Sequence, residues 1–519
     1  MVENRQVVRV EVKMKVATSA QMTRIDNASQ EEYGIPGIIL MEDAGLSAWE
    51  SIVRNIEPGS SVIFVVGKGN NGGDALVMAR HAALRSGFTP RLIYAAPPDS
   101  FSPSTAIHAA SLAALGVASV RWDTDPATAR EWILGGDWII DGLAGTGLTG
   151  ALRSPLKEIA DLVNSTTGVT VSIDLPSGSG DEWTPGMPIV DADITLTIGL
   201  PKKCLYQPVA RGHAGEIRIV PIAFPRVLTE SDALSTTLLD ESDIKRFLPQ
   251  ERLDSYKGSR GVVAIFAGSH GTTGAAVLVS NSTLRAGAGM VTLYTDDDVY
   301  LPLAGQLVSV MVRSFDGDLS CIDVDRVDTV VAGPGWGRSP DREDRLRGLV
   351  RGFHRGVLDA DALTVLAGMQ DTPHLGPDWV LTPHVGELAR LLHTTNDHVS
   401  RDFFAAALEA SRKYNCIVVA KSWVTVIARP DGETALYDGM NPRMGTAGTG
   451  DVLAGTIGAL LCRCADGWSA ARAGVLVHGK AGRIAGRRLG YFLSQDLPDE
   501  IGRILGSSAS PAERETDRP

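Results

Sequence analysis

Short apolar runs alternate with helical segments through the first half of the chain. Helices are predicted over about residues 75–86 and 155–163, between runs that suit β-strands. The predicted strands are residues 62–66, 91–94, 138–141, 169–175, 194–198 and 217–221. Short, continuous apolar strands separated by helices are typical of a parallel sheet that is covered by helices on both faces. The pattern therefore predicts a complete α/β domain.

The strand rhythm lapses between about residues 224 and 257, in a polar, acidic stretch that contains Pro225. Few contacts cross such a stretch, so we expect a domain boundary there. A second α/β series follows, with a long helix predicted over residues 451–461. Its predicted strands are residues 262–267, 329–332, 357–358, 380–381, 417–420 and 424–428. We expect one domain over residues 1–230, a second over 236–506 and a disordered tail over 507–519.

Length and composition agree with two α/β domains. The 519 residues exceed one ordinary core, and 44% of them are hydrophobic. The net charge of −12 comes from 61 acidic and 49 basic side chains, so neither nucleic acid nor a membrane surface is an expected partner. The five cysteines lack Cys-x-x-Cys spacing, which predicts reduced thiols. With no apolar run near the ~18 residues of a spanning helix, a soluble, cytoplasmic protein is expected.

Two glycine-rich loops, far apart in the chain, each close on an aspartate. Residues 67–74 follow a predicted strand and end at Asp74, and residues 445–451 lead into a predicted helix and end at Asp451. Glycine lets the backbone approach a ligand closely, and the N–H groups at the start of a helix favour an anion. Each loop is a candidate phosphate site with a candidate acid or base beside it. The alternative for each is a turn that only caps a helix.

Two further strand ends are polar or rich in glycine. Asp141 is followed by glycines at residues 142, 145 and 147, and Asp174 is followed by a Leu-Pro-Ser-Gly turn. Ligands of open parallel sheets bind at the carboxyl ends of the strands, so these segments and the first loop would meet in one crevice. A buried carboxylate there is costly without a partner or a function. The combination favours a ligand site over a simple turn.

These three segments, together with residues 22–26 and 34–45, resemble the NAD(P)H-hydrate epimerase domain over about residues 14–225. The resemblance implies a Rossmann-like three-layer αβα fold with Asp174 as the catalytic residue, which would shuttle a proton at the hydrated nicotinamide ring. It also implies a potassium ion held by Asn71, Asp141 and Ser177. The implied dinucleotide-binding residues are Asn70, Asn71, Gly72, Gly73, Asp74, Gly145, Thr146, Gly147, Leu148, Thr149, Gly150, Ala151 and Asp174.

Five segments accompany the second loop, at residues 267–276, 332–337, 358–363, 381–387 and 421–425. They resemble the ADP- or ATP-dependent NAD(P)H-hydrate dehydratase, which has a ribokinase-like αβα fold, over about residues 240–505. The resemblance implies that Asp451 is the catalytic base while a nucleotide with Mg²⁺ phosphorylates the C6 hydroxyl. The implied binding residues are Lys421, Ser422, Trp423, Val424, Thr425 and Gly450 for the nucleotide, and Ala275, Gly335, Gly337, His384 and Asp451 for the hydrated dinucleotide. Asp359 and Asp361 hold either backbone turns or magnesium.

The expected function is repair of hydrated nicotinamide cofactors by an isomerase and a carbon–oxygen lyase on one chain. The first site would interconvert the R and S forms of NADHX and NADPHX, and the second would dehydrate the S form to NADH or NADPH at the expense of ADP or ATP. The alternative is a ribokinase-like vitamin kinase whose N-terminal half is a non-catalytic binding module. A kinase would leave a stable phosphorylated product, whereas a dehydratase would release free phosphate. A homo-oligomer is expected.

Overall fold

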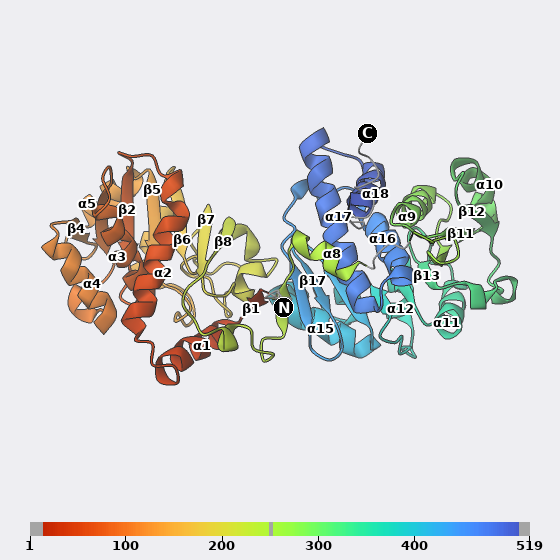
Figure 1. Ribbon diagram of the computed structural model, residues 1–519, viewed down its shortest axis with the longest axis horizontal. Coiled ribbons are helices and arrows are strands. Elements are labelled where there is room, and N and C mark those ends of the chain that lie inside the picture. The colour runs from red at the N-terminus through yellow and green to blue at the C-terminus, as the bar shows by residue number, and fades with distance from the viewer. Residues whose placement is uncertain (1–13, 249–252, 508–519) are drawn as a thin grey trace, which may run out of the picture. The chain divides into compact units, whose positions relative to one another are not determined.

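The computed structural model describes residues 14–248 and 253–507, and the chain divides into two compact units (Figure 1). The first unit ends at Thr237 and the second begins at Leu238. The predicted disordered tail lies outside the described residues, apart from Ser507. That residue ends helix α18 (Leu497–Ser507), so the prediction is wrong there.

The first unit is built on a parallel sheet whose strands lie in the order β4-β3-β2-β5-β6-β7-β8. In chain order, the bounds are β2 (Ser61–Val66), β3 (Thr89–Tyr94), β4 (Ala118–Arg121), β5 (Trp138–Gly142), β6 (Val169–Ile173), β7 (Ile194–Ile198) and β8 (Glu216–Val220). All except β4 correspond to predicted strands. The half-exposed edge strand β4 has no apolar run, because only strands buried on both faces need one.

Helices cover both faces of this sheet, as predicted. On one face α2 (Gly37–Ile52), α3 (Asn70–Ala83) and α4 (Pro103–Ala114) contribute Trp49, Leu76 and Leu112 to the core. On the other face α5 (Pro126–Leu134) and α6 (Leu156–Val163) contribute Ile133 and Ile159. The N-terminal helix α1 (Ser19–Glu31) belongs to the same unit, in which β1 (Lys15–Val16) pairs antiparallel with residues of β9 (Thr236–Leu238).

Helix α3 begins earlier than the sequence predicts. Its first residue is Asn70 rather than one near Ala75, so Asp74 lies in the second turn of the helix instead of starting it. The Asn-Asn-Gly-Gly sequence has low helix propensity and suggests a loop. Tertiary packing of α3 against α2 and α4 overrides this, since a Cβ on Gly73 would lie 2.4 Å from Met41 Sδ and 2.8 Å from Thr105 Oγ1.

The sheet of the second unit has the order β18-β17-β16-β15-β14-β13-β10-β11-β12. The strands are β10 (Val262–Phe266), β11 (Met290–Thr295), β12 (Met311–Ser314), β13 (Thr329–Ala332), β14 (Gly356–Leu358), β15 (Trp379–Leu381), β16 (Ile417–Lys421), β17 (Thr425–Ala428) and β18 (Thr434–Tyr437). Strands from β12 to β16 run parallel, and β16, β17 and β18 pair antiparallel. Strands β11, β12 and β18 were not among the predicted strands.

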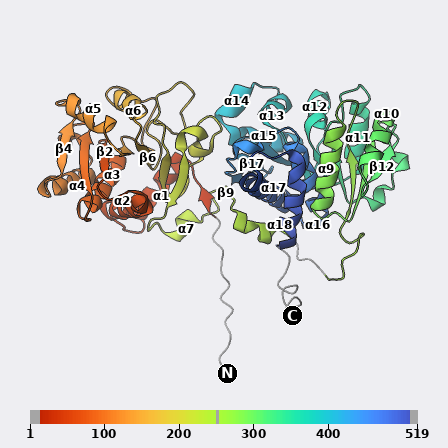
Figure 2. The same cartoon turned by 90° about the horizontal axis from the view of Figure 1, so that it is seen from above.

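Two layers of helices enclose this second sheet (Figure 2). One layer contains α9 (Thr273–Arg285), α16 (Thr449–Arg463), α17 (Gly467–Leu489) and α18, and the other contains α11 (Arg342–Gly352), α12 (Ala360–Gly368), α13 (Val385–Leu391) and α15 (Phe403–Tyr414). Helix α16 is the predicted long helix, and its residues 452–461 are all buried. It packs so tightly on α9 that only glycine fits at residue 455: a Cβ on Gly455 would lie 2.2 Å from Ser282 Oγ.

Across residues 14–248 and 253–507, no helix is both long enough and apolar enough to cross a membrane. Cys204, Cys416, Cys462 and Cys464 are free cysteines.

Candidate functional site

Asp174 lies at the carboxyl end of β6 in a left-handed backbone conformation, with a φ of 62°. Its Oδ1 accepts hydrogen bonds from the Ile198 N–H at 3.2 Å and from the ammonium group of Lys202. Lys202 is only 1% exposed and follows β7, the neighbouring strand. Positive φ is uncommon for a residue other than glycine, and such strain gathers at functional sites. The geometry therefore marks Asp174 as a candidate catalytic group with a buried lysine as its partner.

Asp74 is buried on α3 in the same neighbourhood. Burial, and next the negative charges of Asp174 and Asp26, hold its pKa well above the ordinary value, while Lys202 opposes them. The positive charge of Lys202 thus acts on two predicted site carboxylates, those of Asp174 and Asp74. Sequence reasoning missed it, although a Lys-Lys pair directly after a buried strand was a signal that could have identified it.

The predicted potassium ligands surround the turn that follows β5. Ser177 Oγ lies 2.6 Å from Asp141 Oδ1, and it accepts a hydrogen bond from the Ala144 N–H at 2.9 Å. Burial raises the pKa of Asp141, although hydrogen bonds from Ser177 and Ser172 oppose the rise. Asn71 is buried beside the same turn, and neither polar atom of its amide has a hydrogen-bond partner. A Cβ on Gly145 would lie 3.2 Å from Asn71 Oδ1.

The other predicted ligands of the first site fall into two groups. Gly72 and Gly73 are buried by packing, since a Cβ on Gly73 would lie 2.4 Å from Met41 Sδ and 2.8 Å from Thr105 Oγ1. The residues of the second group are half-exposed or exposed, and they lie in the loop after β5 and at the start of α3. They are Asn70, Gly145, Thr146, Gly147, Leu148, Thr149, Gly150 and Ala151. The structure therefore brings the first loop and both strand ends together at one edge of the sheet, as predicted.

At the second site, the ammonium group of Lys421 lies 2.9 Å from Asp359 Oδ1. Lys421 ends β16, and the buried Asp359 precedes α12. Burial alone would lower the pKa of Lys421, but the charges of Asp359 and Glu387 outweigh it and raise the pKa. Gly450 leaves room for this pair, because a Cβ there would lie 3.3 Å from Lys421 Nζ.

Asp451 lies in the first turn of α16, whose N-cap residue Gly448 has a φ of 92°. Burial raises the pKa of Asp451 to about 7, and the negative charge of Asp359 adds to the rise while Lys421 opposes it. A carboxyl group with such a pKa can accept a proton at neutral pH and release it again. The site thus combines a candidate base with a helix N-terminus that favours an anion.

His384 is the N-cap residue of α13, and its ring Nδ1 accepts hydrogen bonds from the N–H groups of Gly386 at 3.0 Å and Glu387 at 3.3 Å. The ring therefore has Nε2 as its remaining polar atom, and the side chain is 60% exposed. Glu387 returns the interaction by accepting from the His384 N–H at 2.9 Å. Burial raises the pKa of Glu387, which faces Lys421. Glu387 was not among the predicted site residues.

Gly335 and Gly337 have positive φ values of 56° and 79°. The hydroxyl groups of Ser269 and Thr272 donate to the Gly335 carbonyl oxygen at 3.0 and 2.8 Å, and a Cβ on Gly335 would lie 3.0 Å from that of Ala275. The three residues predicted to meet the dinucleotide here, Ala275, Gly335 and Gly337, are thus held beside one another.

The structure separates the roles of the two aspartates that the sequence left open. Asp361 accepts from the Gly337 N–H at 2.9 Å and from Arg338 Nε at 2.7 Å, so it holds a backbone turn. Asp359 instead forms the ion pair with Lys421. In both cases the partners of the aspartate are other residues of this chain.

The predicted nucleotide segment forms the turn between β16 and β17. Its backbone closes with a hydrogen bond of 3.0 Å from the Ser422 N–H to the Val424 carbonyl oxygen. The side chain of Val424 is buried in the core, whereas Trp423 is largely exposed and Thr425 half-exposed. Any ligand contact by Val424 would therefore use its backbone.

His478 of α17 is a further residue of the second site that sequence reasoning missed. Its ring Nε2 lies 2.9 Å from the carbonyl oxygen of Thr449, the first residue of α16. Burial, and next the charge of Lys421, lower the pKa of His478 to about 4. The ring is therefore neutral at pH 7 and donates its Nε2 proton to the loop that leads to Asp451. A lone histidine within a helix gave no motif to recognise.

Two αβα units, each with an ion pair of a carboxylate and a lysine near strand ends, define an enzyme with two separate sites. The second unit has the ribokinase-like fold: a ribokinase-like superfamily protein from Enterococcus faecalis matches with a TM-score of 0.50 and 24% identity, over 53% of this chain and 98% of that chain. Residues 263–504 match the family described as NAD(P)H-hydrate dehydratase, and residues 37–204 match the YjeF-related protein N-terminus.

Curated relatives extend over nearly the whole chain. The bifunctional NAD(P)H-hydrate repair enzyme Nnr of Moorella thermoacetica is 33% identical over 515 residues, 95% of this chain and 97% of that protein. Its namesake in Thermofilum pendens is 34% identical over 527 residues, 97% of this chain and 99% of that protein. The chain therefore belongs to the family of bifunctional NAD(P)H-hydrate repair enzymes. The predicted fold class and the predicted pairing of epimerase and dehydratase are confirmed, and the kinase alternative is not favoured.

Proposed function

We propose that this chain repairs hydrated nicotinamide cofactors at two independent sites, with Asp174 and Asp451 as their catalytic residues. The observation that supports this most directly is the lysine near each carboxylate: the ammonium group of Lys202 contacts Asp174, and that of Lys421, which pairs with Asp359 at 2.9 Å, opposes the rise in the pKa of Asp451. A buried carboxylate without such a partner would be costly and would have no preferred orientation.

At the first site, the carboxyl group of Asp174 gives a proton to the C6 hydroxyl of NADHX or NADPHX. The C6–O bond then breaks, water leaves, and water adds to the opposite face of the ring while a proton returns to Asp174. Lys202 is a positioning residue in this scheme, because it fixes the carboxylate through a bond from a side chain that is itself buried. R and S forms would then reach equilibrium.

Potassium fits the residues beside this site. The unpartnered amide of Asn71, the carboxylate of Asp141 and the hydroxyl of Ser177 offer hard oxygen atoms around one turn. The ion would supply a positive charge that offsets the buried Asp141 and would satisfy Asn71 Oδ1.

At the second site, Asp451 accepts the proton of the C6 hydroxyl while that oxygen attacks the terminal phosphorus of ADP or ATP. The bond from this phosphorus to the bridging oxygen breaks, and AMP or ADP leaves. The phosphorylated intermediate loses phosphate as the C6–O bond breaks, and loss of a C5 proton restores the ring of NADH or NADPH. Lys421 and the N-terminus of α16 would neutralise charge on the phosphoryl group. Mg²⁺ would arrive with the phosphates of the nucleotide and neutralise their oxygens. Trp423 is exposed and suits stacking on adenine.

One spectrophotometric assay tests these assignments together. The recovery of reduced-nicotinamide absorbance is followed from the R or the S hydrate, with ADP or ATP in turn, and with K⁺ or Na⁺. We expect recovery from S to need nucleotide and Mg²⁺, and recovery from R to need K⁺ as well. Recovery from S without nucleotide would contradict the phosphorylation step. Location in the cytoplasm and a homo-oligomer stay predictions.

A further inference from the structure

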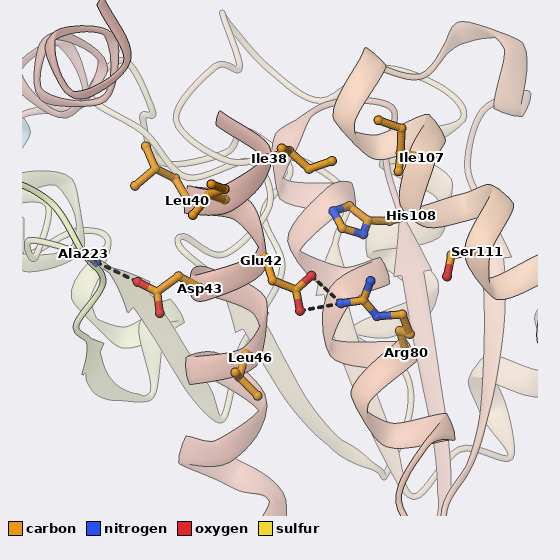
Figure 3. Close-up of a pocket in the computed structure, with 11 residues that line it drawn as sticks. Ile38, Leu40, Glu42, Asp43, Leu46, Arg80, Ile107, His108, Ser111 and Ala223 are labelled. Atoms are coloured by element: carbon orange, nitrogen blue, oxygen red, sulfur yellow. Dashed lines mark hydrogen bonds and ion pairs between the residues drawn. The ribbon is translucent and has the colours of Figure 1, made fainter. Parts of the chain in front are cut away.

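A hollow of about 680 Å³ lies between α2, α3 and α4 of the first unit (Figure 3). Its walls are mainly aliphatic, from Ile38, Leu40 and Leu46 of α2 and from Ile107 of α4. None of its lining residues belongs to the two sites described above. Pockets of this volume with aliphatic walls and a few polar groups are the usual form of small-molecule sites.

His108 of α4 is one of the residues that line this hollow (Figure 3). The residue is 3% exposed, and neither ring nitrogen has a hydrogen-bond partner. Burial lowers the pKa of His108, with Arg80 adding to the effect, so the ring is neutral and offers one N–H donor and one acceptor. A buried polar ring without a partner is destabilising, and native proteins rarely keep one without a reason.

The other polar groups of the hollow already have partners. Glu42 accepts hydrogen bonds from Arg80 and, at 2.8 Å, from His81 Nε2, and these hold the pKa of Glu42 below its ordinary value although burial opposes them. Asp43 accepts from the Ala223 N–H at 2.7 Å. The charges of Glu42 and Arg80 balance one another, and Asp43 leaves a slight negative excess. An anion would therefore find no net attraction here.

We propose that this hollow binds a small neutral molecule with an aliphatic body and one carbonyl group, which accepts a hydrogen bond from the ring of His108. The aliphatic walls would bury the body, and the carbonyl would satisfy the unpartnered ring. The ligand class is neutral because Glu42 and Asp43 disfavour a carboxylate or phosphate.

The position of the hollow connects it to the first site. Met41 and Thr105 pack on Gly73 of α3, and they precede lining residues of α2 and α4 by one and two positions. Helix α3 begins with the segment that contains Asn71 and Asp74. An occupant that moves α2 or α4 would therefore act on the helix that supports the predicted dinucleotide and potassium ligands.

The test uses the full-length protein with ¹⁵N-labelled histidine rings and cyclohexanecarboxamide as the probe. We expect a saturable shift of the His108 ring signals at millimolar probe, because the probe has few heavy atoms. Cyclohexanecarboxylate, which differs in charge, should bind at least fivefold more weakly. His108→Phe should also weaken binding of the amide about fivefold or more, measured by ligand-observed NMR, as expected for a lost hydrogen bond. The exposed His398 is the control position, and His398→Gln should leave the affinity unchanged.

Ile107→Glu provides a second variant, since Ile107 is 55% exposed and its substitution should not prevent folding. A charge there should abolish amide binding while circular dichroism stays that of the parent protein. The proposal is overturned by any of three results: no saturable shift at His108, equal affinity for amide and carboxylate, or unchanged affinity in the Ile107→Glu protein. Dissociation of an oligomer by Ile107→Glu would likewise overturn it, because the hollow would then be covered by a second copy.

Discussion

The ammonium group of Lys421 lies 2.9 Å from the carboxylate of Asp359, and the charges of these two groups have opposite effects on the pKa of Asp451. Asp359 raises the pKa of Asp451, and Lys421 lowers it. This arrangement leaves the proposed base with a pKa of about 7, although it lies at a helix N-terminus that would favour the charged form. Burial is the largest cause of the raised pKa, and the balance between these two neighbours then adjusts the pH at which the second site can work.

Replacing Asp359 and replacing Lys421 should move the acid limb of the dehydratase pH profile in opposite directions. Asp359→Asn removes a negative charge, so the limb of kcat/KM should shift to lower pH by about 0.5–1 unit. Lys421→Met removes the positive charge, so the limb should shift to higher pH, with a large loss of activity as well. The measurement is kcat/KM for the S hydrate between pH 5 and pH 9. Shifts in the same direction would exclude Asp451 as the titrating group.

Asp451→Asn should stabilise the protein while removing dehydratase activity. The folded-state pKa of Asp451 is raised to about 7 from an ordinary 3.8, so the folded state binds more protons between these values. Stability from this group is therefore present below about pH 4 and is lost as the pH rises to 7. We expect the variant to gain about 1–4 kcal/mol at pH 8, by denaturant unfolding, and nothing at pH 4. An equal gain at both pH values would contradict the raised pKa.

Two substitutions of Asp174 should separate chemistry from backbone strain. Asn tolerates the left-handed conformation, so Asp174→Asn should fold with nearly parental stability while the epimerase rate falls by roughly 10²–10⁴. Asp174→Ala should lose the same activity and an additional ~1 kcal/mol of stability. Asn415, with a φ of 49°, is the matched control: its replacement by Ala should cost similar stability and no epimerase activity. An active Asp174→Asn protein would exclude the proton-transfer role.

Potassium should stabilise the protein through Asn71. Replacing Na⁺ by K⁺, at a K⁺ concentration about ten times its dissociation constant, should raise the free energy of unfolding by about 1.4 kcal/mol. Asn71→Leu keeps the shape but removes the unpartnered amide, so the response to K⁺ should disappear without a loss of fold. Asn70→Leu, at the exposed neighbouring position, should keep the response. Scanning calorimetry of the first transition in each salt provides the measurement, and a K⁺ response in Asn71→Leu would exclude this ligand.

The sequence was most informative where chemistry and topology coincide. Strand ends that close on Asp141, Asp174 and the first glycine-rich loop could be assigned to one edge of a sheet, because parallel strands leave their carboxyl ends together. The start of α3 could not be predicted, since the packing of Gly73 against Met41 and Thr105 overrides a poor helix sequence.

Single side chains that belong to no sequence motif could not be predicted either. Lys202 and Glu387 come from segments distant in sequence from the aspartates they influence, and His478 from a different helix than Thr449, which it contacts. Only tertiary packing brings these groups near. Their effects also depend on burial, which shifts pKa values by amounts that residue type alone does not indicate. The sequence therefore predicted the reacting carboxylates but not the groups that tune them.

The central claim is that two independent sites act in turn, and complementation between two variants tests it most directly. The Asp174→Asn and Asp451→Asn proteins are assayed separately and then mixed, with pure R hydrate, nucleotide, Mg²⁺ and K⁺. Each alone should restore reduced nicotinamide from R only at the background rate of spontaneous epimerisation or not at all, and the mixture should restore it at a rate close to that of the parent. Failure of the mixture, with each remaining activity intact, would contradict the account.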